Sequence, residues 1–527
     1  MKGFGDLYKS KLKKGKENKK TLTEDQIITL AINNHVKGKI AEAVKYYEIA
    51  ITKGFANEVV FANYGLILQD FGKLNDANKH TLKAIELNPN FAAAYSNLGG
   101  ILRDLGKLND AEEYTHKAIQ LDPNSVQSRS NMASILRDLG KLNDAERSAN
   151  KAIELDPNFE NAYFNLGSIL LELGKLKDAE ISSLRALKIN PNFASVYYIL
   201  GAALQKQHKL AEAIEAYKKS LSLKPNNADV YNNMGISLYD QGKLGEAIEA
   251  YQKTLELNPN NALAYYNMGY ALVGQNKREE AIKVYEKGLA MRPDYDPLLA
   301  QKLIQQVHLC DWPAVAADRS NIELLGVVDV AIAPFQMLSI EDAPDRHRLR
   351  SEIYAREKLQ QNPLPPSAKP SKKPKRLRIG YFSTDFREHP VAYLISKVLE
   401  NHNRDSFEVY GYSLHGSKES ELRNRLIKSF DFFLDVKGMS DRDVALKSRQ
   451  DEIDIAIDLN GYTQNARSGI FAYRAAPVQI NYLGFAGTMG TEFIDYIIAD
   501  QYLIPTNNRK YFREKQIYLP NTYMPTD

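Results

Sequence analysis

The sequence predicts a molecule in two parts, an α-solenoid of stacked helix hairpins followed by an α/β lobe with a parallel sheet. Three observations lead to this prediction: a 34-residue repeat runs through the first part, strands alternate with helical segments in the second, and a Pro-, Lys- and Ser-rich segment separates the two. The chain has 527 residues, 44% of them hydrophobic and 25% charged, which is typical of a globular protein with two or more domains.

Regularly spaced prolines define the repeat. They are Pro89, Pro123, Pro157, Pro191, Pro225, Pro259 and Pro293, each 34 residues after the one before. Small residues such as Gly99 and Ala111 keep two fixed phases between the prolines, which lets the two helices of a unit approach closely. A glycine such as Gly106 supplies the left-handed residue between the helices, and His208 and Asn276 take its place in two units. The pattern therefore predicts about eight helix hairpins.

A 34-residue hairpin with small residues in both helices and a terminal Pro resembles the tetratricopeptide repeat. We predict eight such repeats over residues 24–295, a helical cap and transition region over 296–360, a linker over 361–375 and the α/β lobe over 376–527. Residues 1–23 are rich in lysine, and we interpret them as a solvated, disordered tail rather than a membrane- or nucleic-acid-binding segment.

An amide side chain lies two residues before the first-helix glycine in most repeats. These residues are Asn63, Asn97, Asn131, Asn165, Asn233 and Asn267, and Ile199 interrupts the series. Equal phase in a solenoid predicts that they line one surface, where each amide offers a hydrogen-bond donor and an acceptor. Two interpretations stay open: a ladder that holds the backbone of a polypeptide, or amides that only bond a neighbouring turn.

Cysteine content and hydropathy predict a cytoplasmic protein. The single cysteine, Cys310, has no internal disulfide partner, which favours a reducing compartment and the role of a buried free thiol. The N-terminal segment lacks the apolar core of a signal peptide, and no run of 18 apolar residues predicts a membrane span. The sequence also lacks HExxH, P-loop and GxSxG motifs, so it does not support metal or elbow-serine chemistry.

After the linker the pattern changes to short β-branched or aromatic runs separated by helical segments. We predict strands at residues 376–382, 407–414, 453–461, 478–484 and 495–500. This alternation favours a parallel sheet with helices on both faces, and such sheets bind ligands at the carboxyl ends of their strands.

Three loops at predicted strand ends carry polar or glycine residues: STDFREHP (383–390), NGYTQNAR (460–467) and GFAGTMG (484–490). His389 in the first loop is either a base or, as is more frequent for a lone His before Pro, a helix-capping or surface residue. The glycines of the third loop do not have the spacing of a recognised phosphate-binding motif. Each loop is therefore only weak evidence by itself.

In combination, the blocks LRIGYFSTDFREHPVAYL, DLNGYTQNAR and FAYRAAPVQINYLGFAGTMG behind tetratricopeptide repeats resemble protein O-GlcNAc transferases and their SPINDLY-type relatives, glycosyltransferase family 41. The resemblance implies Rossmann-like lobes and an inverting, metal-independent transfer, without a cofactor, from UDP-GlcNAc or another nucleotide sugar to Ser or Thr hydroxyls. It places His389 on the family's active-site histidine, considered as a base, and Tyr462, Thr463, Leu483 and Gly484 in the sugar and acceptor pocket. The asparagine ladder falls on substrate-holding asparagines of the family.

Two departures from the family pattern leave the function open. Asp454 stands where animal members have a second histidine, and the printed sequence ends where the family's first lobe passes to the second, which holds the diphosphate. One interpretation is an O-GlcNAc transferase-like enzyme whose second lobe comes from elsewhere. The other is a non-catalytic tetratricopeptide scaffold for protein–protein interaction. In both cases we expect the 527-residue chain alone to bind UDP-GlcNAc no more tightly than about millimolar.

Overall fold

The structure is a computed structural model that describes residues 22–55, 57–328, 330–359, 363–366, 375–416 and 418–526. The expected tail up to residue 21 and most of the expected linker lie outside these ranges. The chain forms two compact units, Met1–Pro225 and Asn226–Asp527, which are described one after the other. None of the described helices is long and apolar enough to cross a membrane.

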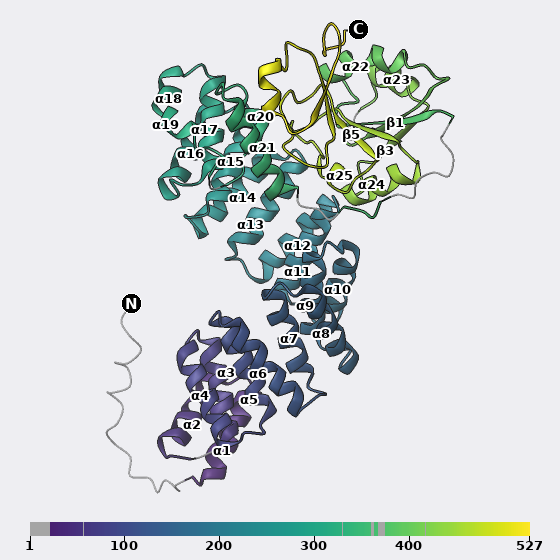
Figure 1. Cartoon of the computed structure of the whole chain (residues 1–527). Coiled ribbons are helices and arrows are strands. Elements are labelled where there is room, and N and C mark those ends of the chain that lie inside the picture. The colour runs from purple at the N-terminus through teal and green to yellow at the C-terminus, as the bar shows by residue number, and fades with distance from the viewer. Residues whose placement is uncertain are drawn as a thin grey trace. The chain divides into compact units, whose positions relative to one another are not determined.

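The first unit consists of paired helices (Figure 1). They are α1 (Glu24–Val36), α2 (Ile40–Thr52), α3 (Glu58–Asp70), α4 (Leu74–Leu87), α5 (Ala92–Asp104), α6 (Leu108–Leu121), α7 (Val126–Asp138), α8 (Leu142–Leu155), α9 (Glu160–Glu172), α10 (Leu176–Ile189), α11 (Ala194–Lys206) and α12 (Leu210–Leu223). The first begins at a capping box, in which Thr23 and Gln26 each bond the other's backbone N–H.

The small residues explain how closely the hairpin helices pack. A Cβ added at Gly99 would clash with the side chain of Thr115, and Ala111 on the facing helix is fully buried. The turn glycines adopt the left-handed region, as at Gly106 with φ 76°, where a Cβ would be strained. His208 adopts φ 59° at the same phase, so the turn residues have the predicted conformation.

The second unit continues the hairpins with α13 (Ala228–Asp240), α14 (Leu244–Leu257), α15 (Ala262–Gly274), α16 (Arg278–Met291), α17 (Asp296–His308) and α18 (Trp312–Ala317). Shorter helices and one long helix follow: α19 (Arg319–Ile322), α20 (Pro334–Met337) and α21 (Pro344–Lys358). The expectation of a buried thiol at Cys310 is wrong, because this cysteine is exposed. It lies 34 residues after Asn276 in the turn that joins α17 to α18, and it adopts the same left-handed conformation, with φ 55°.

A parallel sheet with the order β3-β2-β1-β4-β5-β6-β7 follows in the second unit. Its strands are β1 (Leu377–Ser383), β2 (Phe407–Ser413), β3 (Phe432–Asp435), β4 (Ile455–Asp458), β5 (Val478–Asn481), β6 (Tyr496–Ala499) and β7 (Lys515–Tyr518). The helices between them are α22 (Pro390–Glu400), α23 (Glu421–Lys428), α24 (Asp441–Gln450), α25 (Gly469–Ala472) and the 3-10 helix η1 (Thr506–Tyr511).

Alternate strand residues face two apolar cores, so the sheet is covered on both sides. Phe382 packs in a core with Val444 of α24 and Phe471 of α25. Ile379 belongs to the core of the other face, which includes Ile395 of α22 and the leucines of α23. The predicted solenoid and Rossmann-like lobe are thus confirmed, and the carboxyl ends of the strands carry the loops of interest.

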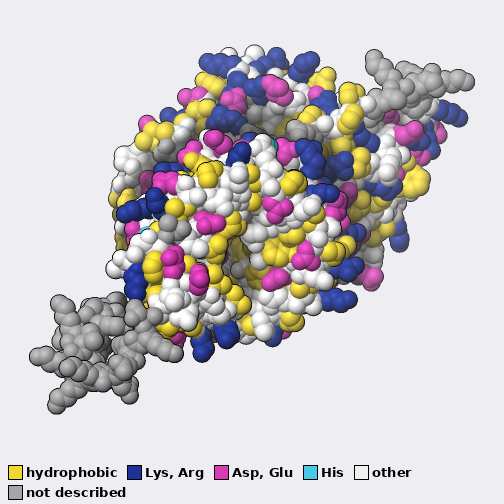
Figure 2. Space-filling view, turned by 90° about the horizontal axis from the view of Figure 1, so that it is seen from below, with side chains coloured by type: hydrophobic (Ala, Val, Ile, Leu, Met, Phe, Trp, Pro, Cys, Tyr) yellow, Lys and Arg dark blue, Asp and Glu magenta, His cyan; other side chains and the backbone are white. Residues whose placement is uncertain are grey.

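The surface shows no gathering of one sign of charge on the face drawn in Figure 2, where acidic and basic side chains are interspersed. This agrees with the nearly balanced totals of 69 Lys and Arg and 65 Asp and Glu.

Candidate functional site

The candidate site lies at the carboxyl ends of β1 and β4, which are neighbours in the sheet. The connection after β1 leads to β2 on one side, whereas the strands after β4 continue on the other side. The end of the sheet where the strand order reverses in this way is the usual ligand position in open α/β sheets. The loop after β1 contains His389, and the loop after β4 contains Tyr462 and Thr463.

Asp385 and Asn460 join these two loops. The Asn460 side-chain N–H donates to Asp385 Oδ2 at 2.6 Å, and its Oδ1 accepts from the Thr384 backbone N–H at 2.8 Å. The same amide nitrogen lies 3.5 Å from Thr463 Oγ1. The carboxylate of Asp385, only 6% exposed, lies 3.7 Å from His389 Nδ1. Sequence reasoning quoted both loops but did not single out Asp385 or Asn460; the polar residues directly after adjacent strands were the available signal.

His389 is both a helix cap and an accessible imidazole. Its backbone is extended, and its Nδ1 accepts the Val391 backbone N–H at 3.3 Å at the start of α22. The side chain nevertheless remains 35% exposed next to the Asp385 carboxylate. The capping interpretation therefore accounts for Nδ1 alone, and the exposed part of the ring is accessible to a ligand.

Tyr462 and Leu483 are buried, whereas Gly484 is half-buried. The Tyr462 hydroxyl donates to the Met489 carbonyl at 2.6 Å, and burial raises the pKa of this hydroxyl well above its ordinary value. Leu483 is 8% exposed and has φ 76°, so the chain bends sharply before Gly484. Thr463 is half-buried. Of the predicted pocket residues, Thr463 is the one whose hydroxyl contacts the Asn460 amide, at 3.5 Å, and the assignment of all four stays a prediction.

The buried carboxylate of Glu514 holds the third loop (484–490) through two hydrogen bonds. Glu514, just before β7, accepts the Thr488 hydroxyl at 2.7 Å and the Met489 backbone N–H at 2.5 Å. Burial raises the pKa of Glu514. Because Met489 also accepts from Tyr462, the loops after β4 and β5 are fixed to each other.

Asp458 at the end of β4 organises the NGYT turn and gives it a pH dependence. Its Oδ1 accepts the backbone N–H groups of Asn460 and Gly461 at 2.9 and 3.0 Å. Burial nevertheless raises its pKa from 3.8 to about 6. Since the folded pKa lies above the unfolded one, the unfolded state loses its proton first, and stability falls as the pH rises from about 4 to 6, by about 3 kcal/mol in all.

We expect Asp458→Asn, which keeps an acceptor for both N–H groups, to remove this pH dependence. Hydrogen exchange of β4 amides, corrected for intrinsic rates, should show wild-type protection falling between pH 4.5 and 7 and the variant nearly constant. Asp435→Asn at the exposed end of β3 is the control and should behave as wild type. If wild type and Asp458→Asn lost protection equally with rising pH, Asp458 would not be the group that causes the pH dependence of stability.

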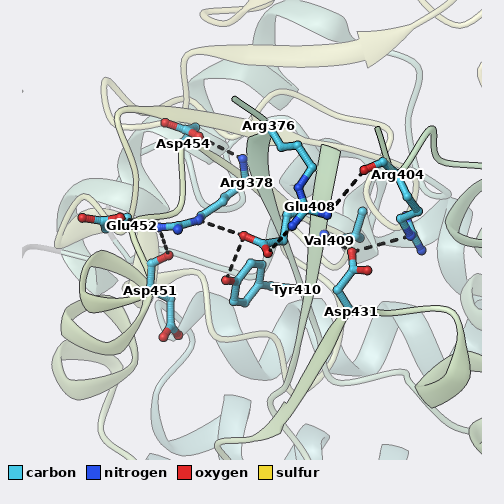
Figure 3. Close-up of polar contacts among 10 residues, drawn as sticks. All are labelled: Arg376, Arg378, Arg404, Glu408, Val409, Tyr410, Asp431, Asp451, Glu452 and Asp454. Carbon is cyan, nitrogen blue, oxygen red and sulfur yellow. Dashed lines mark hydrogen bonds and ion pairs between the residues drawn. The ribbon is translucent and has the colours of Figure 1, made fainter. Parts of the chain in front are cut away.

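A second polar network lies at the opposite, amino edge of the sheet (Figure 3). Glu408 accepts from both Arg376 and Arg378 at 2.9 Å, and Asp454 accepts the Arg378 backbone N–H at 2.9 Å. Figure 3 also shows Arg404 facing Asp431. Asp454, the position of the histidine in animal members, precedes β4 and therefore lies at the end of the strand away from the loops; its contacts here are structural.

The asparagines of the first unit bond the preceding repeat. Asn131 donates to the Ser96 carbonyl at 3.1 Å, and Asn165 donates to the Ser130 carbonyl at 3.0 Å. Asn165 is only 7% exposed. Asn63 bonds the Tyr47 hydroxyl, and Asn97 is half-buried. Asn131 and Asn165 thus tie helices of successive repeats together rather than bonding a neighbouring turn, and polypeptide binding by the amides stays a prediction.

In the second unit, Asn267 donates to Asn232 Oδ1 at 3.3 Å, and Asn233 on α13 is half-buried. Next to Asn267 on α15, Tyr266 and Tyr270 stack with ring centroids 6.0 Å apart. The Gln464 amide donates to the Tyr270 hydroxyl at 3.3 Å. The last repeats of this unit therefore contact the loop that holds Thr463.

Comparison with known proteins identifies both parts of the chain. Residues 353–527 match the family model Glycosyl transferase family 41, and residues 92–125, 160–193 and 262–295 match tetratricopeptide-repeat models. A 171-residue segment is 42% identical to "Probable UDP-N-acetylglucosamine–peptide N-acetylglucosaminyltransferase SEC" of Arabidopsis thaliana, covering 31% of this chain and 18% of that protein. The UDP-N-acetylglucosamine–peptide N-acetylglucosaminyltransferase of Caenorhabditis elegans is 39% identical over 153 residues, which cover 29% of this chain and 13% of the relative.

Among solved structures, a mutant of the Thermobaculum terrenum O-GlcNAc transferase aligns with a TM-score of 0.43 and 26% identity, covering 63% of this chain and 58% of that chain. The repeats and the lobe with its loops at the β1–β4 switch point define a tetratricopeptide-repeat protein with a glycosyltransferase lobe. With the sequence matches, the lobe within residues 353–527 is that of glycosyltransferase family 41, the family of the O-GlcNAc transferase and SPINDLY-type relatives.

Proposed function

We propose that the chain takes part in the transfer of N-acetylglucosamine from UDP-GlcNAc to Ser or Thr hydroxyls of cytoplasmic polypeptides. The lobe supplies the sugar and acceptor side of the site, and the repeats hold the polypeptide. The names of the relatives describe transfer of N-acetylglucosamine from UDP-N-acetylglucosamine to peptide, which supports the proposal. The observation that carries the proposal is the linked group of Asp385, Asn460 and His389 at the topological switch point, within the segment that matches family 41.

In the reacting tautomer the proton sits on His389 Nδ1, toward the Asp385 carboxylate and in place of the hydrogen bond from the Val391 N–H, so that Nε2 can take the proton of the acceptor hydroxyl. The Asp385 carboxylate next to the ring stabilises positive charge on the imidazole as a proton is taken up, and Asn460 holds that carboxylate in place. Thr463, 3.5 Å from the Asn460 amide, lines the same loop and supplies a hydroxyl for hydrogen bonds to the sugar or the peptide.

The test is transfer of radiolabelled GlcNAc from UDP-GlcNAc to a library of Ser- and Thr-containing peptides. The full chain is assayed alone and with an added second lobe from a family-41 relative. Labelled peptide in either arm supports the proposal. Peptide capture without label in both arms would instead support the scaffold interpretation.

The repeats give a separate prediction about polypeptide capture. We expect replacement of Asn97, Asn131 and Asn165 by Ala to lower the affinity for the peptide library about tenfold or more, since each lost hydrogen bond costs about 0.5–1.5 kcal/mol. The measurement is fluorescence anisotropy of labelled peptides, with circular dichroism to show that the helices persist.

The matched control replaces Asn75, Asn109 and Asn143, which are exposed on the second helices of three repeats. This control should bind the peptides like wild type. Because Asn131 and Asn165 also bond the preceding repeat, we expect the ladder variant, in which Asn97, Asn131 and Asn165 are replaced by Ala, to melt at a modestly lower temperature than wild type. Unchanged affinity of the ladder variant would leave the asparagines with a structural role only.

A further inference from the structure

One face of α15 carries large apolar side chains where α5 and α7 carry small or polar ones. Leu263, Tyr266 and Tyr270 lie three and four residues apart, so they share one face of this helix. At the same phases α5 has Ala93, Ser96 and Gly100, and α7 has Gln127, Ser130 and Ser134. Packing of the repeat therefore does not require these three large side chains, which we call the α15 stripe.

The α15 stripe is open to solvent at one end and forms a cluster of rings at the other. Leu263 is 45% exposed, and Tyr266 and Tyr270 are half-buried. The rings of Tyr266 and Tyr270 stack with centroids 6.0 Å apart, and Tyr239 of α13 packs on Tyr270 with centroids 5.8 Å apart. Burial raises the pKa of the Tyr266 hydroxyl to about 12 and also raises that of Tyr270, so both are uncharged at neutral pH. The stripe therefore offers rings and methyl groups that carry no charge.

The α15 stripe lies next to the loop that holds Thr463. The Gln464 amide donates to the Tyr270 hydroxyl at 3.3 Å, and Gln464 directly follows Thr463 in the chain. One residue of backbone and one glutamine side chain therefore separate Thr463 from Tyr270, a distance of at most about 12 Å, or about four residues of extended chain. A polypeptide whose Ser or Thr lies at the candidate site thus reaches the stripe with a side chain a few residues away.

We propose that the α15 stripe binds an aromatic side chain of the acceptor polypeptide, within about six residues of the Ser or Thr that receives the sugar. This rests on the proposed function, because the acceptor polypeptide is taken as the occupant. The contact between the stripe and the Thr463 loop favours that occupant over an unrelated protein. An aromatic side chain suits the stripe because its ring extends the packing of Tyr239, Tyr266 and Tyr270, and such ring pairs gain more than their buried area alone gives. The stripe thus selects acceptor sites by a residue near the one that is modified.

Binding of short peptides to the full chain tests the selection. Each peptide contains one Thr and one Phe, and the Phe is moved stepwise away from the Thr in both directions, with Ala in its place as the reference. We expect Phe at one position, or at two adjacent ones, to raise the affinity measured by fluorescence anisotropy at least about fivefold over Ala. Because no sugar donor is added, this result does not depend on transfer, and failure of the proposed function would appear separately in the transfer assay.

Substitutions in the stripe should remove the preference for Phe. Tyr266→Ser with Tyr270→Ser should reduce the gain from Phe to less than about twofold. This variant keeps the repeat fold because α7 already has Ser130 and Ser134 at these phases, and circular dichroism checks the helices. Tyr270→Phe keeps the ring and loses only the hydroxyl that bonds the neighbouring loop, so it should keep the preference. Tyr502→Ser, at a 76% exposed tyrosine of the lobe, is the control and should behave as wild type.

A photo-crosslink locates the aromatic residue on the unchanged protein. A peptide with benzoylphenylalanine at the preferred position should crosslink to the segment that contains the α15 stripe, which mass spectrometry identifies. Crosslinks confined to other segments, no gain or an equal gain from Phe at every position, or a gain that persists in the Tyr266→Ser/Tyr270→Ser variant would each overturn the proposal. So would a larger gain from Arg than from Phe, which the charge of Asp240 near Tyr239 would favour.

Discussion

Replacement of His389 by Asn should abolish most transfer without destabilising the lobe. Asn is a good N-cap, and its Oδ1 replaces the ring nitrogen that accepts the Val391 N–H. It does not replace the imidazole beside Asp385. We therefore expect the transfer rate with peptide and UDP-GlcNAc to fall about 100-fold or more, the usual contribution of a general acid or base.

His389→Ala separates capping from catalysis. It should lose as much activity as the Asn variant and, in addition, about 0.5–2 kcal/mol of stability, because α22 loses its cap. His415→Asn, an exposed histidine after β2, is the control and should retain full activity. If the Asn variant recovered most of the transfer rate, capping would be the whole function of His389.

Gly484→Ala should have the largest effect on the stability of the lobe. A Cβ at this position would clash with the backbone carbonyl of Leu459 and lie 3.2 Å from the Asn460 backbone. The Leu459 backbone is held by its own N–H bond to Phe382 at 3.1 Å, so it has little freedom to move away. We expect a loss of about 3 kcal/mol, the upper range for overpacking.

Pulse proteolysis in urea, with lobe fragments identified by mass, measures this loss. Gly438→Ala is the matched control, because an added Cβ at Gly438 has open space around it. Its effect should stay within about 0.5 kcal/mol. Similar urea midpoints for the two variants would show that the backbone at Leu459 can move far enough to accommodate the added Cβ.

The solenoid could be predicted in detail because the residues that define each helix hairpin lie within one 34-residue repeat and recur in the next. Turn positions such as Gly106 and His208 follow from the 34-residue phase, and both adopt positive φ. Cys310 has the same phase beyond the last predicted repeat, and it is an exposed turn residue rather than the buried thiol expected from its being the single cysteine.

The sheet could be predicted only in its centre. The edge strands β3 and β7 contain no buried residue, and Phe432 of β3 is 48% exposed, so they lack the apolar runs of buried parallel strands. The order of the strands depends on packing between distant segments. For the same reason the bond between Asp385 and Asn460, which joins residues 75 positions apart, has no signal in either loop alone.

The hydrogen bonds that asparagine side chains form between repeats affect how the number of repeats can change. Asn131 reaches back 35 residues to Ser96, and Asn165 reaches back 35 residues to Ser130. If 34 residues ending at Ser130 were removed, Asn165 would again lie 35 residues after a serine, now Ser96, and it could form the same hydrogen bond. Unequal recombination that adds or removes whole units therefore preserves every bond, whereas a change of one residue misaligns them. Such arrays are expected to grow and shrink in steps of one repeat during evolution.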